Sequence, residues 1–155
     1  MINLFGEHNC KVDAKGRVMF PSALKKQLTP VLQKGFVLKQ SIFNSCLELY
    51  PMDEWDEALV DVKSKNRFIK KNNDFRRVFF AGVKLIELDG TGRFLISKNL
   101  CDYAGIKKEI VISAIGGIME IWDKEAYQIE IAKAAKNLPK LTEEVMGDEK
   151  LNEDE

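Results

Sequence analysis

The feature that most constrains how this chain folds is an internal duplication. The pentapeptide Asp-x-x-Gly-Arg occurs twice, as DAKGR at residues 13–17 and as DGTGR at 89–93. At the same offset of 76 positions, apolar residues align as well, such as Phe20 with Ile96. Since such a repeat is one structural unit used twice, the 155 residues predict two half-size units that share a core.

The duplication extends beyond the pentapeptides at a slightly smaller offset. CLELYPMDEWDE at 46–57 aligns with IMEIWDKEAYQI at 118–129, so the second copy is four residues shorter, a difference that a loop absorbs. The end of the chain is acidic and poor in apolar residues, which is typical of disorder. The sequence therefore predicts a first repeat at 1–65, a connector at 66–80, a second repeat at 81–138 and an acidic, disordered tail at 139–155.

Each pentapeptide has the composition of a tight turn between two strands. Gly16 and Gly92 supply the left-handed backbone conformation that a short hairpin requires. Asp13 and Asp89 stand where a carboxylate accepts backbone N–H groups of the turn. We predict strands at 10–12 and 18–20 in the first copy, and at 83–88 and 94–96 in the second.

The remaining elements are expected in the same order in both copies. A short helix comes next, for which Ser22 and Ser97 are candidate N-caps and Gly105 a candidate C-terminal residue. Two strands and a longer helix close each copy, and IGGI at 115–118 is a two-residue hairpin signal. Phe79–Phe80 are expected to enter the core. The predicted strands lie at 36–39, 47–50, 109–114 and 118–122, and the predicted long helices at 52–65 and 124–137.

The formal net charge of zero conceals a strong segregation of charge. Residues 1–46 carry a net charge of +5 and residues 63–80 a net charge of +6. Residues 47–62 and 141–155 each carry a net charge of −6. Because a polyanion responds to the local field rather than to the total charge, overall neutrality does not exclude a nucleic-acid partner.

The sequence offers little for catalysis or for a membrane. His8 is the single histidine and has no serine or cysteine motif around it, and no phosphate-binding loop is present. We therefore expect a protein that is not an enzyme and needs no cofactor or metal. No apolar run approaches the roughly 20 residues that cross a bilayer. Cys10, Cys46 and Cys101 are odd in number and far apart, which argues against disulfides and favours a reducing cytoplasm.

The two pentapeptides are the strongest candidates for function. Each acid, Asp13 or Asp89, is followed four residues later by an arginine, which competes with a cation and favours an ion pair over a metal site. An arginine lifted on a turn, with lysines such as Lys11 and Lys15 nearby, suits phosphate contact and the recognition of guanine. The alternative is that the pentapeptide is only a turn clamp, closed by an Asp–Arg ion pair.

Several separate motifs resemble the MraZ family of bacterial transcriptional regulators. They are GEHNCKVDAKGRVMFPSALKK near the start, RRVFFAG in the middle, ELDGTGRFLI followed by LCDYAGI, and EIWDKEAY towards the end. The motifs occur in the family's order and together cover about residues 1–135. The resemblance implies an α+β, β-rich swapped-hairpin fold of the AbrB-like type, with two fused pseudo-repeats that each hold short strands and two helices.

The resemblance also implies a function and a set of residues. Members of the family form ring-shaped homo-oligomers and bind direct repeats in the promoter of their own operon, at the head of the cell-division and cell-wall gene cluster. The family's DNA-facing Asp-x-x-x-Arg motif maps onto Asp13 with Arg17 and onto Asp89 with Arg93. The full set of candidate DNA-binding residues is Arg17, Lys15, Arg93, Asp13, Asp89, Lys11 and Lys25, on turns formed by Gly16 and Gly92.

The second copy departs from the family pattern more than the first. Pro21 and Lys25 follow the first turn, and Lys25 stands where the family usually has arginine. The corresponding residues of the second copy are Ser97 and Cys101, where the family commonly shows proline and arginine. We therefore expect the second turn to contact DNA more weakly, or to be mainly structural, and place most weight on the first.

The sequence as a whole predicts a sequence-specific DNA-binding transcriptional regulator and repressor. Its expected partners are double-stranded promoter DNA and further copies of itself in a ring, and its expected location is the cytoplasm, at the nucleoid. Two alternatives stay open. One is an antitoxin-like interaction module whose basic turns dock an acidic protein partner, and the other is a structural ring without a role in DNA binding.

Overall fold

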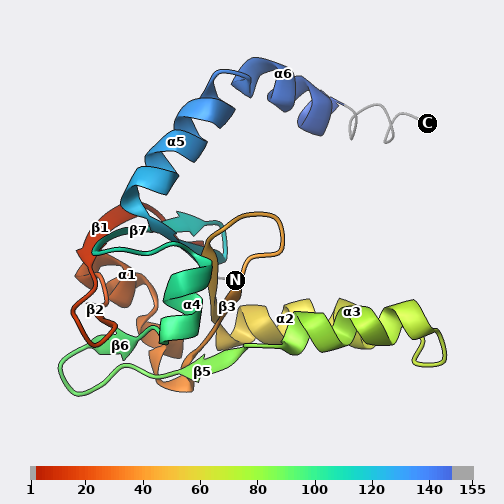
Figure 1. Cartoon of the computed structure of the whole chain (residues 1–155), viewed down its shortest axis with the longest axis horizontal. Coiled ribbons are helices and arrows are strands. Elements are labelled where there is room, and N and C mark those ends of the chain that lie inside the picture. Colours follow the sequence, from red (N-terminus) through yellow and green to blue (C-terminus); the bar gives the residue numbers. More distant parts are fainter. Residues whose placement is uncertain (1–2, 148–155) are drawn as a thin grey trace. The chain divides into compact units, whose positions relative to one another are not determined.

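The computed structural model describes residues 3–147 of the chain. They belong to two compact units, the first ending at Asp123 and the second beginning at Lys124 (Figure 1). The first unit contains every β-strand of the described chain. Its first repeat comprises β1 (Glu7–Lys11), β2 (Arg17–Met19), α1 (Ser22–Gln27), the 3-10 helix η1 (Thr29–Lys34), β3 (Phe36–Gln40), β4 (Leu47–Pro51) and α2 (Met52–Lys63).

The second repeat follows the same order after an additional helix. That helix, α3 (Lys70–Phe80), occupies most of the predicted connector. Gly116 and Gly117 form the predicted two-residue turn between the last two strands of the repeat, with Gly116 at a φ of +82°. The elements after α3 are β5 (Lys84–Ile86), β6 (Arg93–Leu95), α4 (Lys98–Tyr103), β7 (Glu109–Ile115) and β8 (Ile118–Asp123) in the first unit, and α5 (Lys124–Ala135), which opens the second unit.

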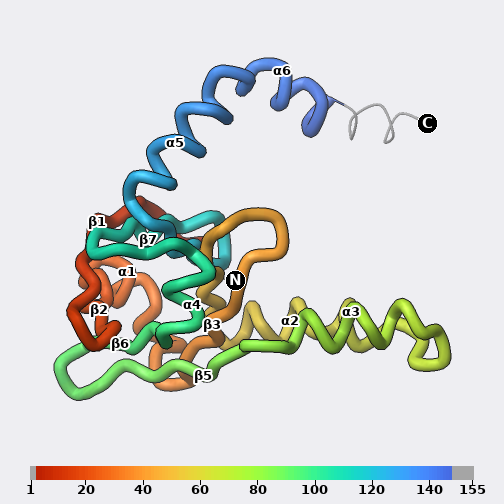
Figure 2. Tube along the Cα trace, viewed as in Figure 1, coloured from red at the N-terminus to blue at the C-terminus, as the bar shows by residue number. Residues whose placement is uncertain are grey.

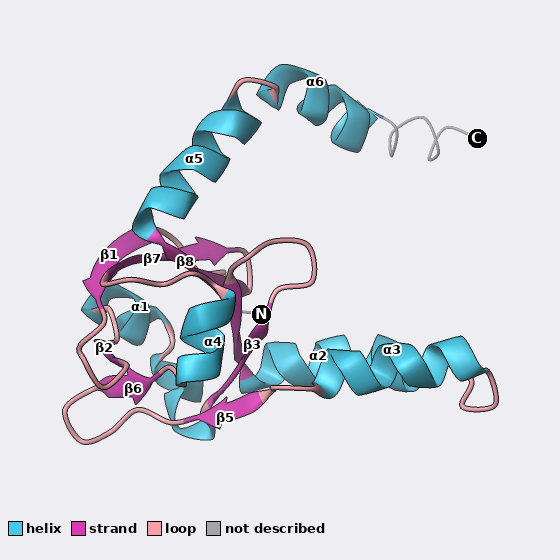
Figure 3. Cartoon of the chain, viewed as in Figure 1, coloured by secondary structure: helices cyan, strands magenta, loops and turns pink. Residues whose placement is uncertain are grey.

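The strands form one six-stranded sheet and one two-stranded ribbon, and all the described pairs are antiparallel. The sheet order is β1-β7-β8-β4-β3-β5, and the ribbon pairs β2 with β6 (Figure 3). The first strand of each repeat therefore pairs with a strand of the other repeat, β1 with β7 and β5 with β3. This exchange confirms the predicted α+β, swapped-hairpin fold.

The register relates the two repeats by an approximate twofold axis. In the ribbon, Val18 lies opposite Phe94, the residue that aligns with it in the duplication. At the centre of the sheet, Glu48 lies opposite Glu120, again its aligned counterpart. Equivalent residues face each other only where a symmetry axis passes, so the axis runs through both the ribbon and the centre of the sheet.

The strands on either side of each pentapeptide do not pair as an extended hairpin. After the first turn, the isolated bridge between Val12 and Val18 joins the two strands, and the chain then separates into the sheet and the ribbon (Figure 2). The prediction of a tight turn is confirmed, and the local hairpin around it is short: the Val12–Val18 bridge is followed by the hydrogen bond from the Asp13 N–H to the Arg17 carbonyl at 3.0 Å. The reason is that the core lies between the two layers, which must diverge to enclose it.

The core fills the space between the inner face of the sheet and the ribbon. Leu47 and Leu49 of β4 are fully buried in the same apolar cluster as Val18 and Phe94 of the ribbon, and α1 adds Leu24. Burying each such side chain contributes about 1.5–3 kcal/mol. The ribbon and its two turns are therefore held on a packed platform.

The predicted burial of Phe79–Phe80 in this core is wrong. Phe79 stacks on Trp55 of α2 with ring centroids 5.8 Å apart, and Phe80 packs edge-on against the same ring at 6.3 Å while staying 39% exposed. Trp55 also packs edge-on against Tyr50 of β4. The two phenylalanines thus pack α3 against α2 in a separate aromatic cluster. They do not reach the main core, because α2 and α3 do not lie between the sheet and the ribbon.

The predicted helix caps hold in part. α1 begins at Ser22 itself after Pro21, so the Ser22 side chain is not an N-cap. Ser97 precedes α4 at the N-cap position, but its side chain makes no capping hydrogen bond, and its buried hydroxyl has no partner in the described chain. Gly105, with a φ of +60°, follows the C-cap residue Ala104 of α4, as predicted.

The second unit is helical where the structure describes it. After α5 come α6 (Leu138–Thr142) and a π-helical turn, η2 (Glu143–Gly147). Residues 139–147, assigned from the sequence to a disordered tail, are thus helical, and Pro139 is accommodated because it lies in the first turn of α6. Residues 148–155 lie outside the described residues. Within residues 3–147, no helix combines the length and apolar character that crossing a membrane requires.

Candidate nucleic-acid interface

The ribbon places both pentapeptide arginines on one exposed face. Arg17 lies opposite Leu95 and Arg93 lies opposite Met19, while the pair between them points into the core. Directly opposite residues of an antiparallel pair share a face. These four side chains therefore lie together on the outer face of the ribbon, with the two arginines at diagonal corners. Met19 and Leu95 occupy the other corners and are 56% and 53% exposed.

Each turn is anchored on the opposite repeat. The carbonyl oxygen of Gly16 accepts a hydrogen bond from the backbone N–H of Ile96 at 2.8 Å. The carbonyl oxygen of Gly92 accepts one from Phe20 at 3.0 Å. The two turns therefore continue the two ends of the ribbon, and neither repeat forms its turn independently of the other.

The first turn is organised by the carboxylate of Asp13. Its Oδ1 accepts hydrogen bonds from the backbone N–H groups of Lys15 and Arg17, both at 2.9 Å. Its Oδ2 accepts the Nε–H of Arg17 at 2.8 Å. The backbone N–H of Arg17, followed by its side chain and by the Lys15 N–H, lowers the pKa of Asp13. The predicted turn clamp is present, and the terminal amino groups of Arg17 remain available for another partner.

The second turn is organised by Asp89 in a different way. Oδ1 of Asp89 accepts the backbone N–H groups of Thr91 at 2.9 Å and Arg93 at 3.0 Å, and also the Thr91 hydroxyl at 2.8 Å. The Nε–H of Arg93 donates to the Thr91 hydroxyl at 2.9 Å and lies 3.4 Å from Oδ2 of Asp89. The backbone N–H of Arg93, then the Thr91 hydroxyl, lower the pKa of Asp89 to about 2.

The two glycines adopt the predicted left-handed conformation, with φ values of +86° at Gly16 and +82° at Gly92. Their surroundings differ. A Cβ on Gly16 would come within 2.5 Å of the carbonyl oxygen of Ile96, which is fixed in the core. A Cβ on Gly92 would meet only the flexible side-chain ends of Lys25 and Met19, both at 3.7 Å. The first turn is thus packed more tightly than the second.

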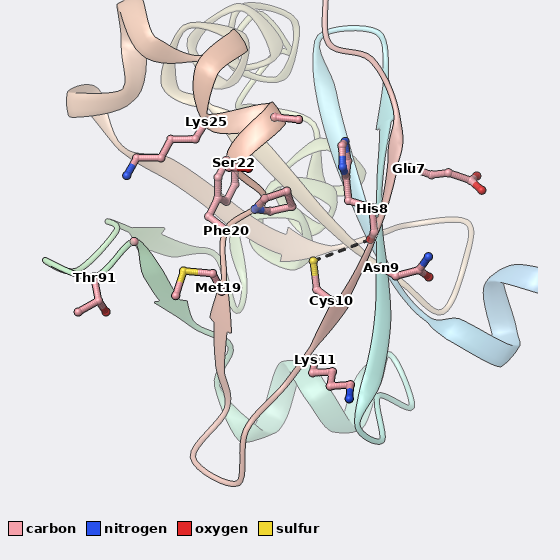
Figure 4. Close-up of a pocket in the computed structure, with 13 residues that line it drawn as sticks. Glu7, His8, Asn9, Cys10, Lys11, Met19, Phe20, Ser22, Lys25 and Thr91 are labelled. Atoms are coloured by element: carbon pink, nitrogen blue, oxygen red, sulfur yellow. Dashed lines mark hydrogen bonds between the residues drawn. The ribbon is translucent and has the colours of Figure 1, made fainter.

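The three candidate lysines lie in two settings, one at the tip of the first turn and two along a groove. Lys15 is exposed at the tip of the first turn. Lys11 ends β1 opposite Glu109 in the sheet register, and its side chain lines a groove shared by β1, β2, α1 and the second turn (Figure 4). Lys25 lines the same groove from α1 and extends towards the side on which Thr91 lies (Figure 4). The structure therefore brings Lys25 to the second turn rather than to its own.

Metal-ligating and thiol groups form no cluster with these residues in the described part of the chain. Among residues 3–147, no three histidine, cysteine, aspartate or glutamate side chains form a group able to hold a metal ion. All three cysteines are free, and burial is the main cause that raises the pKa of Cys46 to about 12. Burial also raises the pKa of Cys10 and Cys101. Such thiols stay protonated at neutral pH, which suits a structural role.

Three residues of this face were not singled out from the sequence. Met19 and Leu95 follow from the two-residue periodicity of a strand, since they stand two positions from Arg17 and Arg93 and share their face. Thr91 had no comparable signal, because its role depends on the positions of three side chains rather than on spacing.

Comparison with known proteins identifies the family to which the chain is similar. The sequence matches the family described as "MraZ protein, putative antitoxin-like" twice, over residues 4–78 and 79–148. The two matches correspond to the two repeats.

Individual relatives agree with the family match. The chain is 55% identical over 149 residues to a protein of Christiangramia forsetii, covering 96% of both chains. It is 52% identical over 155 residues to a protein of Flavobacterium psychrophilum, covering 100% of this chain and 98% of the relative. A protein of Cytophaga hutchinsonii is 35% identical over 141 residues, which cover 91% of this chain and 93% of the relative. Each of the three is named a transcriptional regulator MraZ. Because the family matches residues 4–148 in two copies and relatives of more than 50% identity cover nearly all of the sequence, this chain belongs to the MraZ family.

Proposed function

We propose that this protein is a transcriptional regulator that is not an enzyme and that binds direct repeats in the promoter of its own operon. It acts in the cytoplasm, at the nucleoid, as a ring of identical subunits, and represses the cell-division and cell-wall gene cluster. The names of its relatives support the regulatory role. The observation that carries the DNA-binding role is the exposed ribbon face with an arginine at each of two diagonal corners.

The way in which the arginines are held supports base recognition. Each Nε–H donates a hydrogen bond within its own turn, to Asp13 in the case of Arg17 and to Thr91 in the case of Arg93. The terminal amino groups of both arginines have no partner within the described residues, so each can donate two hydrogen bonds outwards. Arginine uses that pair of bonds on O6 and N7 of guanine, and one such contact discriminates against a wrong base by about 1–3 kcal/mol.

The two-stranded form of the ribbon supports the same role. The major groove of B-DNA is about 12 Å wide and admits a two-stranded β-ribbon. Met19 and Leu95, exposed between the arginines, offer apolar contact to thymine methyl groups or sugars. Lys11, Lys15 and Lys25 around the ribbon supply positive charge for phosphates, which strengthens binding without adding sequence information.

Assembly into a ring makes weak individual contacts sufficient. Several ribbons on one ring would bind tandem repeats together, so that effective concentration raises the overall affinity. Exposed apolar side chains on α3, with Phe75 44% and Val78 76% exposed, support self-association. Light scattering on the purified full chain measures the subunit number directly.

A gel-shift assay with the DNA immediately upstream of this reading frame tests the function. Specific binding predicts that affinity falls by roughly 10³ or more between 50 and 200 mM salt if six or more phosphates are contacted. It also predicts that preference for this DNA survives an excess of unrelated competitor. Equal affinity for any duplex, or none, contradicts the proposal.

The second candidate is an antitoxin-like role, in which the basic turns dock an acidic protein. The family description supports it with its words "putative antitoxin-like". Under this candidate, the Arg17→Ala variant loses a protein partner and the wild-type protein has no preference for its own promoter. The gel-shift assay with competitor therefore separates the two candidates.

A further inference from the structure

The second turn lacks the lysine of the first turn, and in its place it has a threonine whose hydroxyl hydrogen-bonds within the turn. Thr91 occupies the position of Lys15 in the duplication. Its hydroxyl donates to Oδ1 of Asp89 at 2.8 Å and accepts the Nε–H of Arg93 at 2.9 Å. In the first turn, Arg17 reaches its aspartate directly at 2.8 Å, whereas the direct distance in the second turn is 3.4 Å. Thr91 therefore bridges a gap that the carboxylate alone does not close.

The cation missing from the second turn is supplied by the first repeat. The Nζ of Lys25 would lie 3.7 Å from a Cβ on Gly92, and no acceptor for it exists within residues 3–147. In the duplication, Lys25 aligns with Cys101, so no lysine of the second repeat stands at the matching place beside the first turn. Each turn consequently has an arginine and at least one lysine beside it, and the lysine comes from the same repeat in the first turn and from the other repeat in the second.

We propose that the second turn is a complete DNA contact assembled from both repeats, in which Thr91 is the positioning residue for Arg93 and Lys25 is the phosphate-binding cation. The proposal rests on the proposed function and replaces the expectation that the second turn is mainly structural with that of a second contact, weaker than the first. A threonine hydroxyl can act in this way because it donates and accepts at once. It fixes the guanidinium before DNA arrives, which reduces the side-chain entropy lost on binding.

The two contacts are similar in charge but not superimposable. The lysine of the first contact, Lys15, extends from the tip of its own turn, whereas Lys25 approaches the second turn from α1. Two identical ends would favour a palindromic site, in which both halves are read alike. Unequal ends read two different half-sites and give each subunit one orientation on DNA. Such a polarity fits direct repeats, which present the same orientation to every subunit.

The positioning of Arg93 is tested without DNA. In NMR spectra of the full chain, Thr91→Val is expected to shift the Arg93 Nε–H signal and speed its exchange with solvent. Thr91→Ser keeps the hydroxyl and is expected to preserve the wild-type signal. The Arg17 Nε–H signal is the internal control and reports any general loss of folding. An Arg93 signal that is unaffected by Thr91→Val overturns the positioning role.

The DNA contact is tested with the duplex upstream of this reading frame as the probe. Thr91→Val should bind about tenfold more weakly, as expected for losing a hydrogen bond to a charged group, and Thr91→Ser should restore binding. Lys25→Ala should lower the slope of log affinity against log salt by about 1 per subunit, the value for one phosphate contact. Lys26→Ala is the matched control, since Lys26 is also exposed and lies on the same helix.

The results distinguish an error in the composite contact from an error in the proposed function. If the wild-type protein binds the probe but the Thr91 and Lys25 variants bind it equally well, the composite contact is wrong and the proposed function stands. Equal effects of Lys25→Ala and Lys26→Ala contradict the specific role of Lys25. If the wild-type protein does not prefer the probe, the proposed function and the DNA contact are both wrong, whereas the NMR result still decides whether Thr91 positions Arg93.

Discussion

The two pentapeptide turns share a backbone but differ in how they hold their arginines. The backbone N–H of Gly16 donates to the carbonyl of Asp13 at 3.0 Å, and that of Gly92 donates to the carbonyl of Asp89 at the same distance. Arg17 is then held by a carboxylate, while Arg93 is held by a hydroxyl. Duplication thus preserved the frame that lifts an arginine and left the chemistry around it free to diverge.

The largest expected difference between the turns concerns DNA binding. Arg17→Ala is expected to abolish measurable binding to the upstream DNA, because a loss of about 1–3 kcal/mol per contact recurs in every bound subunit. Arg93→Ala should weaken binding less, since a neutral hydroxyl fixes its guanidinium less firmly than a carboxylate. Gel-shift titrations measure both variants, and light scattering should give the wild-type subunit number for each. The reverse order of effects, or a ring that dissociates, contradicts this comparison.

The next difference concerns stability. Gly16→Ala is expected to lower the free energy of unfolding by about 2–4 kcal/mol, because backbone strain costs about 1–3 kcal/mol and the new Cβ would also displace the Ile96 carbonyl. Gly92→Ala should cost only about 1–2 kcal/mol from backbone strain, since the new Cβ would touch only side-chain ends, at an ordinary contact distance of 3.7 Å. Urea denaturation of the two variants checks the order. Equal losses would mean that the two turns are packed alike.

Low pH should weaken the second turn, because protonation of Asp89 weakens the hydrogen bonds that its carboxylate accepts. The pKa of Asp89 is lowered from 3.8 to about 2, so its contribution is fully present above the unfolded pKa and is lost as the pH falls through the folded value. We expect the amide signals of Thr91 and Arg93 in NMR spectra to stay constant from about pH 7 to pH 5 and to change between about pH 4 and pH 2. A change centred above pH 5 would show that another group controls the turn.

The smallest expected effect comes from the residue that opens α4. Ser97 has the backbone angles φ −62° and ψ 155°, close to those of its counterpart Pro21, and its buried hydroxyl has no partner among the described residues. Ser97→Pro should therefore raise the free energy of unfolding by about 0.4–1 kcal/mol, through a less flexible unfolded chain. Thermal denaturation is the measurement, and Ser97→Ala separates the effect of removing the hydroxyl. Destabilisation by proline would show that the two helix starts are not equivalent.

The sequence was sufficient for features that depend on local spacing. The duplication predicted the paired turns, the left-handed Gly16 and Gly92, and the strands that follow them. It did not predict strand partners from local pattern, because β1 pairs Cys10 with Ile110, a hundred residues away, and alternation identifies a strand without its neighbour. The swapped arrangement came from the family resemblance instead.

The charged residues of the candidate site were predicted from the sequence, whereas the contacts that depend on tertiary structure were not. Arg17 and Arg93 were found from their motif, and the structure brings both to one face of the ribbon. Thr91 was not singled out, because its two hydrogen bonds depend on how the turn places Asp89 and Arg93. Lys25 was a candidate from its place in the family pattern, but its position beside Gly92 was not predicted, because the exchange between repeats depends on tertiary structure.

The central claim is that each subunit makes two unlike contacts with DNA, one through each turn. Methylation of guanine N7 in the upstream duplex removes the acceptor that an arginine pairs with, so interference mapping tests the claim directly. For the wild-type protein, two separate groups of interfering guanines are expected in each repeat, and Arg93→Ala should lose one group while keeping the other. A single group, or a pattern that Arg93→Ala leaves unchanged, would contradict the account.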